Sequence, residues 1–117
     1  MYCSIEDFKG EVFWGVSIDY ESNSVMFYTD AGGHGFQMRH DQDCCERVVL
    51  KDVSGDLDDL EGAQILLAEC QTSGKPYADE SHTWTFYRLG TIKGYVTISF
   101  YGSSNGYYSE SVSIVKV

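Results

Sequence analysis

The sequence predicts a mainly β protein with one or two short helical turns. We expect an antiparallel sandwich or partly closed barrel of about eight strands. Several short segments alternate apolar and polar residues with a period of two, which is typical of half-buried strands. Turn-forming Gly, Asn, Asp and Ser residues separate these segments. The 117 residues are 43% hydrophobic, which suffices for one domain with an apolar core.

The elements can be justified in order along the chain. In the first half, the alternation predicts strands over residues 11–20, 25–29, 34–40 and 47–53. One or two helical turns are expected over 56–62, because Ser54 or Asp56 can cap the start and Gly62 suits the end. In the second half, strands are predicted over 65–70, 83–89, 95–101 and 110–117, with the polar segment 71–81 as the longest loop.

Two similar segments suggest that the single domain, residues 1–117, is built from two half-repeats. Residues 5–10 and 57–62 share the pattern apolar, acid, Asp, apolar, charged, Gly, and each segment precedes a strand and three further predicted strands. The half-repeats would span 5–53 and 57–117, with linkers 40–46 and 102–110 at equivalent places. Chance similarity and ordinary turn chemistry are the alternative explanation.

The segment 40–46 places an imidazole, two adjacent thiols and three carboxylates within one short stretch. His40 and Cys44, with Cys45 or Asp41 as a further ligand, could hold a structural zinc ion, because Zn²⁺ accepts nitrogen, sulfur and oxygen ligands. The spacing matches no standard zinc-finger pattern, so buried or surface thiols remain the alternative. A catalytic thiolate is disfavoured because the neighbouring carboxylates oppose ionisation of a thiol.

The cysteine state follows from the expected compartment. No apolar run is long enough to span a membrane, and residues 1–7 do not resemble a signal peptide, so a cytosolic location is expected. Thiols stay reduced there, so the four cysteines are expected to be free or metal-bound. A bridge between the adjacent Cys44 and Cys45 is disfavoured, and a Cys3–Cys70 bridge stays open.

The net charge of −10 argues against direct nucleic-acid binding, which needs Lys and Arg along the phosphates. Residues 41–62 alone carry eight acidic and two basic residues, a net charge of −6. This concentration favours contact with a basic partner, although solubility alone could also explain the charge. The expected contact residues are Asp43, Glu46, Asp56, Asp58, Asp59 and Glu61.

The segment 102–109 has the composition of a recognition loop. Tyr107 and Tyr108 offer rigid rings, while Ser104 and Asn105 offer adaptable polar contacts. Such residues could line a small-ligand pocket or simply form a hairpin loop. The chain contains neither a P-loop nor a dinucleotide-binding motif.

Three motifs resemble a family of small, poorly characterised proteins that bacteriophages and prophages encode. They are HDQDCCE at 40–46, SGDLDDLEG at 54–62 and TWTFYRLGTIKGYVTISFYGSSNGYYSESV at 83–112. The resemblance covers most of the chain from about residue 34 onward. It implies a context more than an activity. Small acidic phage proteins without catalytic motifs resemble counter-defence inhibitors, many of which bind a host nuclease such as a CRISPR effector.

The leading expectation is therefore a non-enzymatic, phage-derived inhibitor that acts in the bacterial cytoplasm. Its acidic region at 41–62 would occupy the basic surface of a defence nuclease, most typically a CRISPR effector, and block the loading of target DNA. One alternative is a sponge that sequesters a nucleotide immune signal at the 102–109 loop. That role would require some of Arg39, Arg47, Arg88 and Lys93 to converge on the ligand. A further alternative is a metal-dependent hydrolase.

Overall fold

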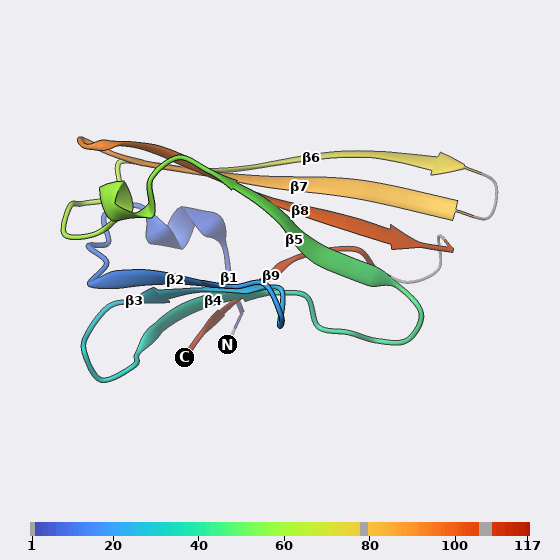
Figure 1. Ribbon diagram of the computed structural model, residues 1–117, viewed down its shortest axis with the longest axis horizontal. Coiled ribbons are helices and arrows are strands. Elements are labelled where there is room, and N and C mark those ends of the chain that lie inside the picture. Colours follow the sequence, from blue (N-terminus) through green and yellow to red (C-terminus); the bar gives the residue numbers. More distant parts are fainter. Residues whose placement is uncertain (1, 78–79, 106–108) are drawn as a thin grey trace.

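The fold consists of two antiparallel sheets that pack face to face (Figure 1). The computed structural model describes residues 2–77, 80–105 and 109–117, with only the backbone for 75–77 and 80. The strands are β1 (Tyr2–Cys3), β2 (Gly15–Asp19), β3 (Ser24–Tyr28), β4 (Gly35–Arg39), β5 (Arg47–Ser54), β6 (Leu67–Tyr77), β7 (Glu80–Thr91), β8 (Gly94–Ser104) and β9 (Ser113–Lys116). Two 3-10 helices, η1 (Ile5–Phe8) and η2 (Leu57–Leu60), accompany them.

The first sheet has the strand order β1-β9-β4-β3-β2, and the second has the order β5-β8-β7-β6. All strand pairs within the sheets are antiparallel. The predicted mainly β sandwich is therefore confirmed. The two sheets stay separate and do not close into a barrel.

Each half of the chain sends its last strand to the other sheet. Strands β2, β3 and β4 form a meander in the first sheet, and β5 then pairs with β8 in the second. Strands β6, β7 and β8 form the second meander, and β9 returns to pair with β4. The chain thus crosses twice between the sheets, through residues 40–46 and 105–112 (Figure 1). Both halves have this arrangement, but a sequence repeat stays a prediction.

The centre of the sandwich is a cluster of aromatic side chains. The ring of Phe8 in η1 lies 5.2 Å from Phe13 and 4.9 Å from both Phe27 and Phe36, measured between centroids. All four rings are buried. The predicted strand over 11–20 is shorter than expected, because residues 12 and 13 form isolated bridges to residues 64 and 61 and β2 begins only at Gly15.

Both helices are short and capped. The expected helical turn over 56–62 is confirmed as η2, where the Asp56 carboxylate accepts the Asp58 N–H at 3.0 Å. Ser4 and Asp7 form a capping box at the start of η1. Within the described residues, neither helix has the length or the apolar character needed to cross a membrane.

The predicted loop over 71–81 is wrong, because β6 continues to Tyr77 and β7 begins at Glu80. The strands of the second meander have 11 or 12 residues, whereas β2, β3 and β4 have five each. The second sheet therefore extends beyond the first (Figure 1). Where the second sheet extends beyond the first, its inner face does not pack against the apolar core. The strands in this region therefore lack the apolar alternation by which a strand is recognised in the sequence. Gly74 and Pro76 are tolerated because β6 is an edge strand.

Candidate functional site at the linker junction

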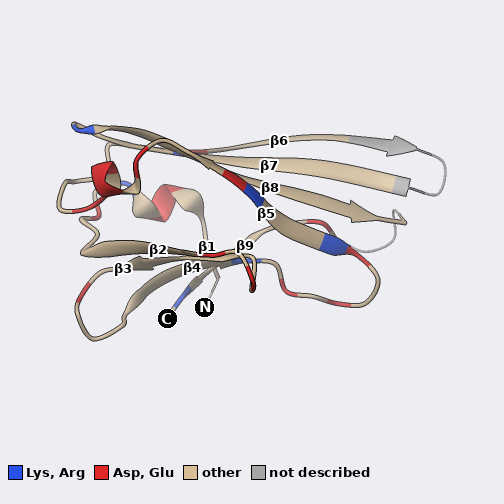
Figure 2. Cartoon of the chain, viewed as in Figure 1, with Lys and Arg blue, Asp and Glu red and all other residues tan. Residues whose placement is uncertain are grey.

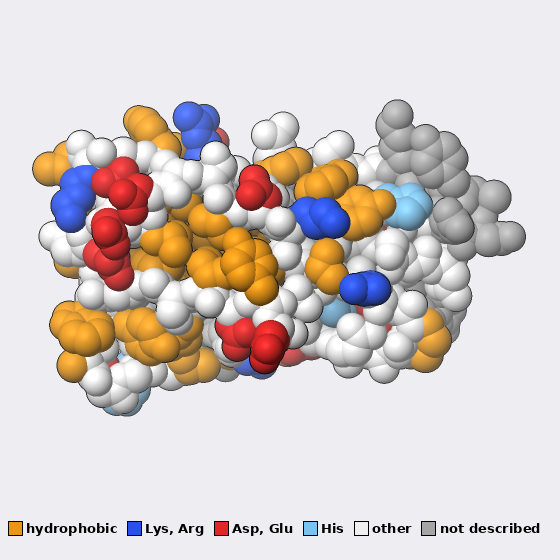
Figure 3. All heavy atoms as spheres, viewed as in Figure 1, with side chains coloured by type: hydrophobic (Ala, Val, Ile, Leu, Met, Phe, Trp, Pro, Cys, Tyr) orange, Lys and Arg blue, Asp and Glu red, His pale blue; other side chains and the backbone are white. Residues whose placement is uncertain are grey.

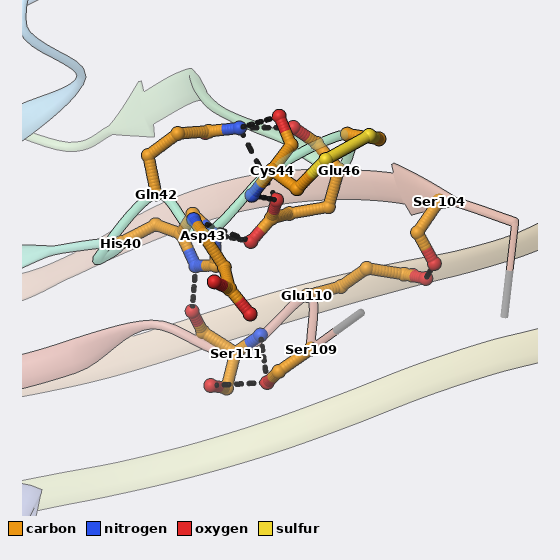
Figure 4. A network of polar contacts seen from close by, with 10 residues as sticks. His40, Gln42, Asp43, Cys44, Glu46, Ser104, Ser109, Glu110 and Ser111 are labelled. Carbon is orange, nitrogen blue, oxygen red and sulfur yellow. Dashed lines mark hydrogen bonds and ion pairs between the residues drawn. A yellow bond between two sulfur atoms is a disulfide. The ribbon is translucent and has the colours of Figure 1, made fainter. Parts of the chain in front are cut away.

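The two crossing linkers meet beyond the end of the first sheet (Figure 4). His40 directly follows β4, and Glu46 directly precedes β5. The His40 ring contacts both Glu46 and the backbone of Ser111, which belongs to the second linker. The junction thus ties together two segments that are 71 positions apart in sequence.

Glu46 is the centre of this network. Its side chain is 1% exposed, and its carboxylate accepts the Asp43 N–H at 3.0 Å and the Cys44 N–H at 2.9 Å. The Gln42 amide donates to the same carboxylate at 3.2 Å. Burial alone would raise the pKa of Glu46, but the donors from Cys44, His40 and Asp43 outweigh it and lower the pKa to about 2. Glu46 is therefore a buried residue that holds the linker together through its hydrogen bonds. It was predicted as a partner-contact residue, but it is not part of the exposed acidic surface.

His40 has acceptors at both ring nitrogens. Nδ1 lies 2.6 Å from the carbonyl oxygen of Ser111, and Nε2 lies 2.9 Å from Glu46 Oε2. The Ser111 carbonyl can only accept, so Nδ1 donates to it, and Nε2 faces the Glu46 carboxylate. The His40 side chain is 7% exposed. The pair is thus a buried polar contact in which neither ring nitrogen is free to coordinate a metal or to face a substrate.

Cys44 and Cys45 form a disulfide, contrary to the expectation of free or metal-bound thiols. We expected reduced thiols because a cytosolic location was expected. That expectation did not consider the local backbone, which decides whether two sulfurs come close enough to bond. The segment turns at Cys44, whose N–H is held by Glu46, and this turn brings the adjacent sulfurs together. Cys3 and Cys70 are not disulfide-bonded.

Thiol counting checks this cysteine assignment. Denatured protein should show two reactive thiols per chain before reduction and four afterwards, because only Cys3 and Cys70 lie outside the disulfide. Alkylation followed by mass spectrometry of the intact chain and its peptides measures both numbers. Four thiols before reduction, in protein purified without reductant, would contradict the disulfide.

The predicted zinc ligands are near one another, but other contacts occupy them. The His40 nitrogens and the two sulfurs are engaged as described, and Asp41 accepts the Tyr2 hydroxyl at 2.6 Å and Arg39 Nε at 3.0 Å. These hydrogen bonds, that of Tyr2 first, lower the pKa of Asp41. Among the described residues, no group of three or more His, Cys, Asp or Glu side chains is placed to hold a metal. Zinc binding at this segment stays a prediction, and it would require these contacts and the Cys44–Cys45 bridge to open.

The second linker contains a counterpart to Glu46. Glu110 is 7% exposed, and Ser104 Oγ donates to its Oε2 at 2.5 Å. The structure describes only part of the predicted ligand loop. Ser104 is half-buried and Asn105 is exposed, whereas Tyr107 and Tyr108 lie outside the described residues. The role of Glu110 was missed, although each linker carries a buried glutamate shortly before the next strand: Glu46 directly precedes β5, and Glu110 lies three residues before the start of β9.

Gly102 in β8 leaves room for Glu110, whose side chain packs against the β8 backbone at this position. A Cβ atom at residue 102 would lie 2.8 Å from Glu110 Cβ and 3.2 Å from Val48 Cγ2. Gly102→Ala should therefore destabilise the protein by about 1–3 kcal/mol through overpacking. Chemical denaturation measures this change. Gly15→Ala is the control, because its Cβ would meet nothing closer than 3.4 Å. Equal losses for both variants would contradict the tight packing of Glu110.

The acidic stretch 41–62 does not form one patch. The eight residues of β5 separate its two ends, which places them about 25 Å apart. Figure 2 shows the acidic residues of the 40–46 linker at one end of β5 and those of η2 at the other. Asp43 is exposed at the linker end, and Asp56 and Asp58 are exposed at the η2 end.

We define the acidic end as Asp56, Asp58, Asp59 and Glu61 together with the neighbouring Trp14 and Ile92. Residues 13 and 61 form a bridge beside Trp14, and Thr91 and Lys93 bond to the backbone oxygens of Asp59 and Glu61 on either side of Ile92. Trp14 is 66% exposed and Ile92 is 86% exposed. Acidic and hydrophobic side chains thus lie side by side at this end (Figure 3).

Two of the acids at this end also have structural roles. Glu61 Oε2 accepts the Val16 N–H at 2.8 Å, and Asp56 caps η2. Asp58 is exposed, and its carboxylate has no such contact among the hydrogen bonds and ion pairs described. Asp58 can therefore be changed to test binding with little effect on folding.

Comparison with known proteins adds a family but no activity. A family model described as a domain of unknown function, DUF7448, matches residues 6–114. This range runs from η1 into β9 and includes both crossing linkers and the acidic end. No curated protein and no solved structure matches the chain.

Proposed function

We propose that this chain, which belongs to the DUF7448 family of unknown function, is a non-enzymatic inhibitor that binds a basic protein surface through its acidic end. The proposed target is a bacterial defence nuclease, most typically a CRISPR effector, whose DNA-binding channel would be covered. The protein would act in the bacterial cytoplasm as a phage-derived counter-defence factor. The family resemblance described above supplies this context.

The observation that carries the proposal is the combination of charge and exposed apolar area at the acidic end. Protein interfaces commonly place aromatic and aliphatic anchors at the centre and polar groups around them. Trp14 and Ile92 are exposed far more than is usual for side chains of their type. Asp56 and Asp58 stand beside them and match a basic partner.

The alternative roles gain less support. The four cations that a nucleotide sponge would need do not converge on one point. Arg39, which pairs with Asp41, and Arg47 flank the linker junction. Arg88, which lies over the Tyr95 ring, and Lys93, which bonds near η2, lie toward the opposite end of β5. The linker junction offers a hydrolase neither a free imidazole nitrogen nor a free thiol at Cys44 or Cys45.

A direct test measures the loading of target DNA onto purified CRISPR nucleases with and without this protein. We expect the protein to bind the DNA-free nuclease, to lower the fraction of loaded DNA, and to bind more weakly as salt rises from 50 to 300 mM, roughly the range over which surface charges become screened. Nuclease that has already bound its target DNA should not bind the protein and should not be inhibited by it. If the protein bound none of the CRISPR nucleases in a panel of different types, the proposal would be contradicted.

Trp14→Ala should weaken this binding by roughly tenfold or more, because exposed tryptophans are frequent interface anchors. The matched control is Tyr20→Ala, which removes a similarly exposed aromatic side chain at the β2–β3 turn. Calorimetric titration of the nuclease with each variant measures the change. Unchanged binding by the Trp14 variant would show that the acidic end does not form the contact.

A further inference from the structure

A second candidate site lies where the long sheet extends beyond the short one. On the inner face of β7, Tyr87 and Leu89 are buried in the core, and Thr85 and Thr83 continue the same face away from it. Alternate residues of a strand share a face, so the lining changes from apolar to hydroxyl-bearing along this one strand. This change creates a polar surface beside residues 110–112 of the second linker.

The space between this surface and the second linker is a pocket of about 370 Å³. Five hydroxyl-bearing residues line it, and Glu110, Tyr87, Cys70 and Val112 complete the described lining: Thr72, Ser81, Thr83, Thr85 and Ser111 are the five. This volume lies in the range of small-molecule sites. A pocket with this many hydroxyls favours a ligand with several hydroxyl groups of its own, because each hydroxyl both donates and accepts.

Glu110 sets the charge of the ligand. Its Oε2 accepts from Ser104, whereas its buried Oε1 has no hydrogen-bond partner within the described residues. A buried carboxylate oxygen without a donor is unfavourable, and a donor from a ligand would satisfy it. The described lining contains no Lys, Arg or His. The pocket therefore suits a cation and disfavours an anion.

We infer that this pocket binds a small amine-bearing polyol, of the amino sugar class. The ligand ammonium would donate to the Glu110 carboxylate. The ligand hydroxyls would pair with Thr83, Thr85 and their hydroxyl-bearing neighbours. This site is separate from the acidic end, so its test is independent of the proposed inhibitor function.

Three related probes separate charge from shape: glucosamine, glucose and glucuronate. Two-dimensional NMR titration of the intact protein should show saturable shifts around Thr83 and Thr85 with glucosamine. Glucose should bind at least about tenfold more weakly, and glucuronate should not bind, because one charge-assisted hydrogen bond is worth roughly that factor. Equal or stronger binding of glucuronate would overturn the inference.

Two variants locate the contact. Glu110→Gln should weaken glucosamine binding by about tenfold or more and leave glucose binding within about twofold, because it removes only the charge. Thr83→Val keeps the shape of the side chain and should weaken the binding of both glucosamine and glucose. It tests the site independently if the Glu110→Gln variant does not fold. The inference fails if no probe binds the wild type, or if glucosamine binds a folded Glu110→Gln variant as tightly as the wild type.

Discussion

Phe8→Ala should lower the free energy of unfolding by about 3–5 kcal/mol, the largest effect we expect from any single substitution. Phe8 is fully buried, and it is the one core ring supplied by η1. Its removal would leave a cavity bordered by Phe13, Phe27 and Phe36, which are fixed in other elements and can fill the space only in part. The loss is a large share of the roughly 5–15 kcal/mol of a typical domain.

Urea denaturation measures this change, with the midpoint and the slope analysed separately. Ile92→Ala is the matched control, because its side chain is 86% exposed and should change stability by less than about 0.5 kcal/mol. A loss for Phe8→Ala as small as that of the control would contradict the position of η1 between the sheets.

His40→Ala should lower the melting temperature by roughly 10 °C, because it leaves the buried Glu46 carboxylate without its contact to the imidazole. It also removes the contact to Ser111 that joins the two linkers. His34→Ala is the control, since His34 pairs with Asp30 at the same 2.9 Å but with a side chain that is 70% exposed. The exposed pair should matter little, with a change below about 2 °C. Similar effects of both substitutions would show that burial of the pair is unimportant.

The pH dependence of stability tests the same junction. The pKa of Glu46 is lowered to about 2 in the fold, below its ordinary value of 4.5. Its contribution to stability is therefore fully present above pH 4.5 and is lost as the pH falls toward 2. Melting curves between pH 2 and 7 should show a smaller decline for Glu46→Gln than for the wild type. An identical decline would mean that Glu46 titrates normally.

The alternation of apolar residues was enough to predict the fold class and most strands. In the predicted strand over 95–101, the alternation places Val96, Ile98 and Phe100 on one face, and all three are buried in β8. It failed over 71–81, because the inner face of the extended sheet meets a polar pocket and the apolar signal is absent there. The exchange of β5 and β9 between the sheets is a tertiary pairing that no local pattern encodes.

The candidate site was found in part. The segment 40–46 was identified by its composition, but composition could not show that Glu46 is buried under backbone donors or that His40 contacts Ser111. The acidic stretch was identified as a unit because its members are close in sequence. A strand in its middle separates them in space, and only the fold shows which acids lie beside exposed Trp14 and Ile92.

The most direct test of the central claim compares two charge reversals in the calorimetric titration of a nuclease that the protein binds. Asp58→Lys changes the acidic end, and Asp43→Lys makes the same change at the opposite end of β5. We expect Asp58→Lys to raise Kd about tenfold or more, since like charges then face each other, and Asp43→Lys to stay within about twofold. A larger effect of Asp43→Lys, or equal effects of both, would contradict binding through the acidic end.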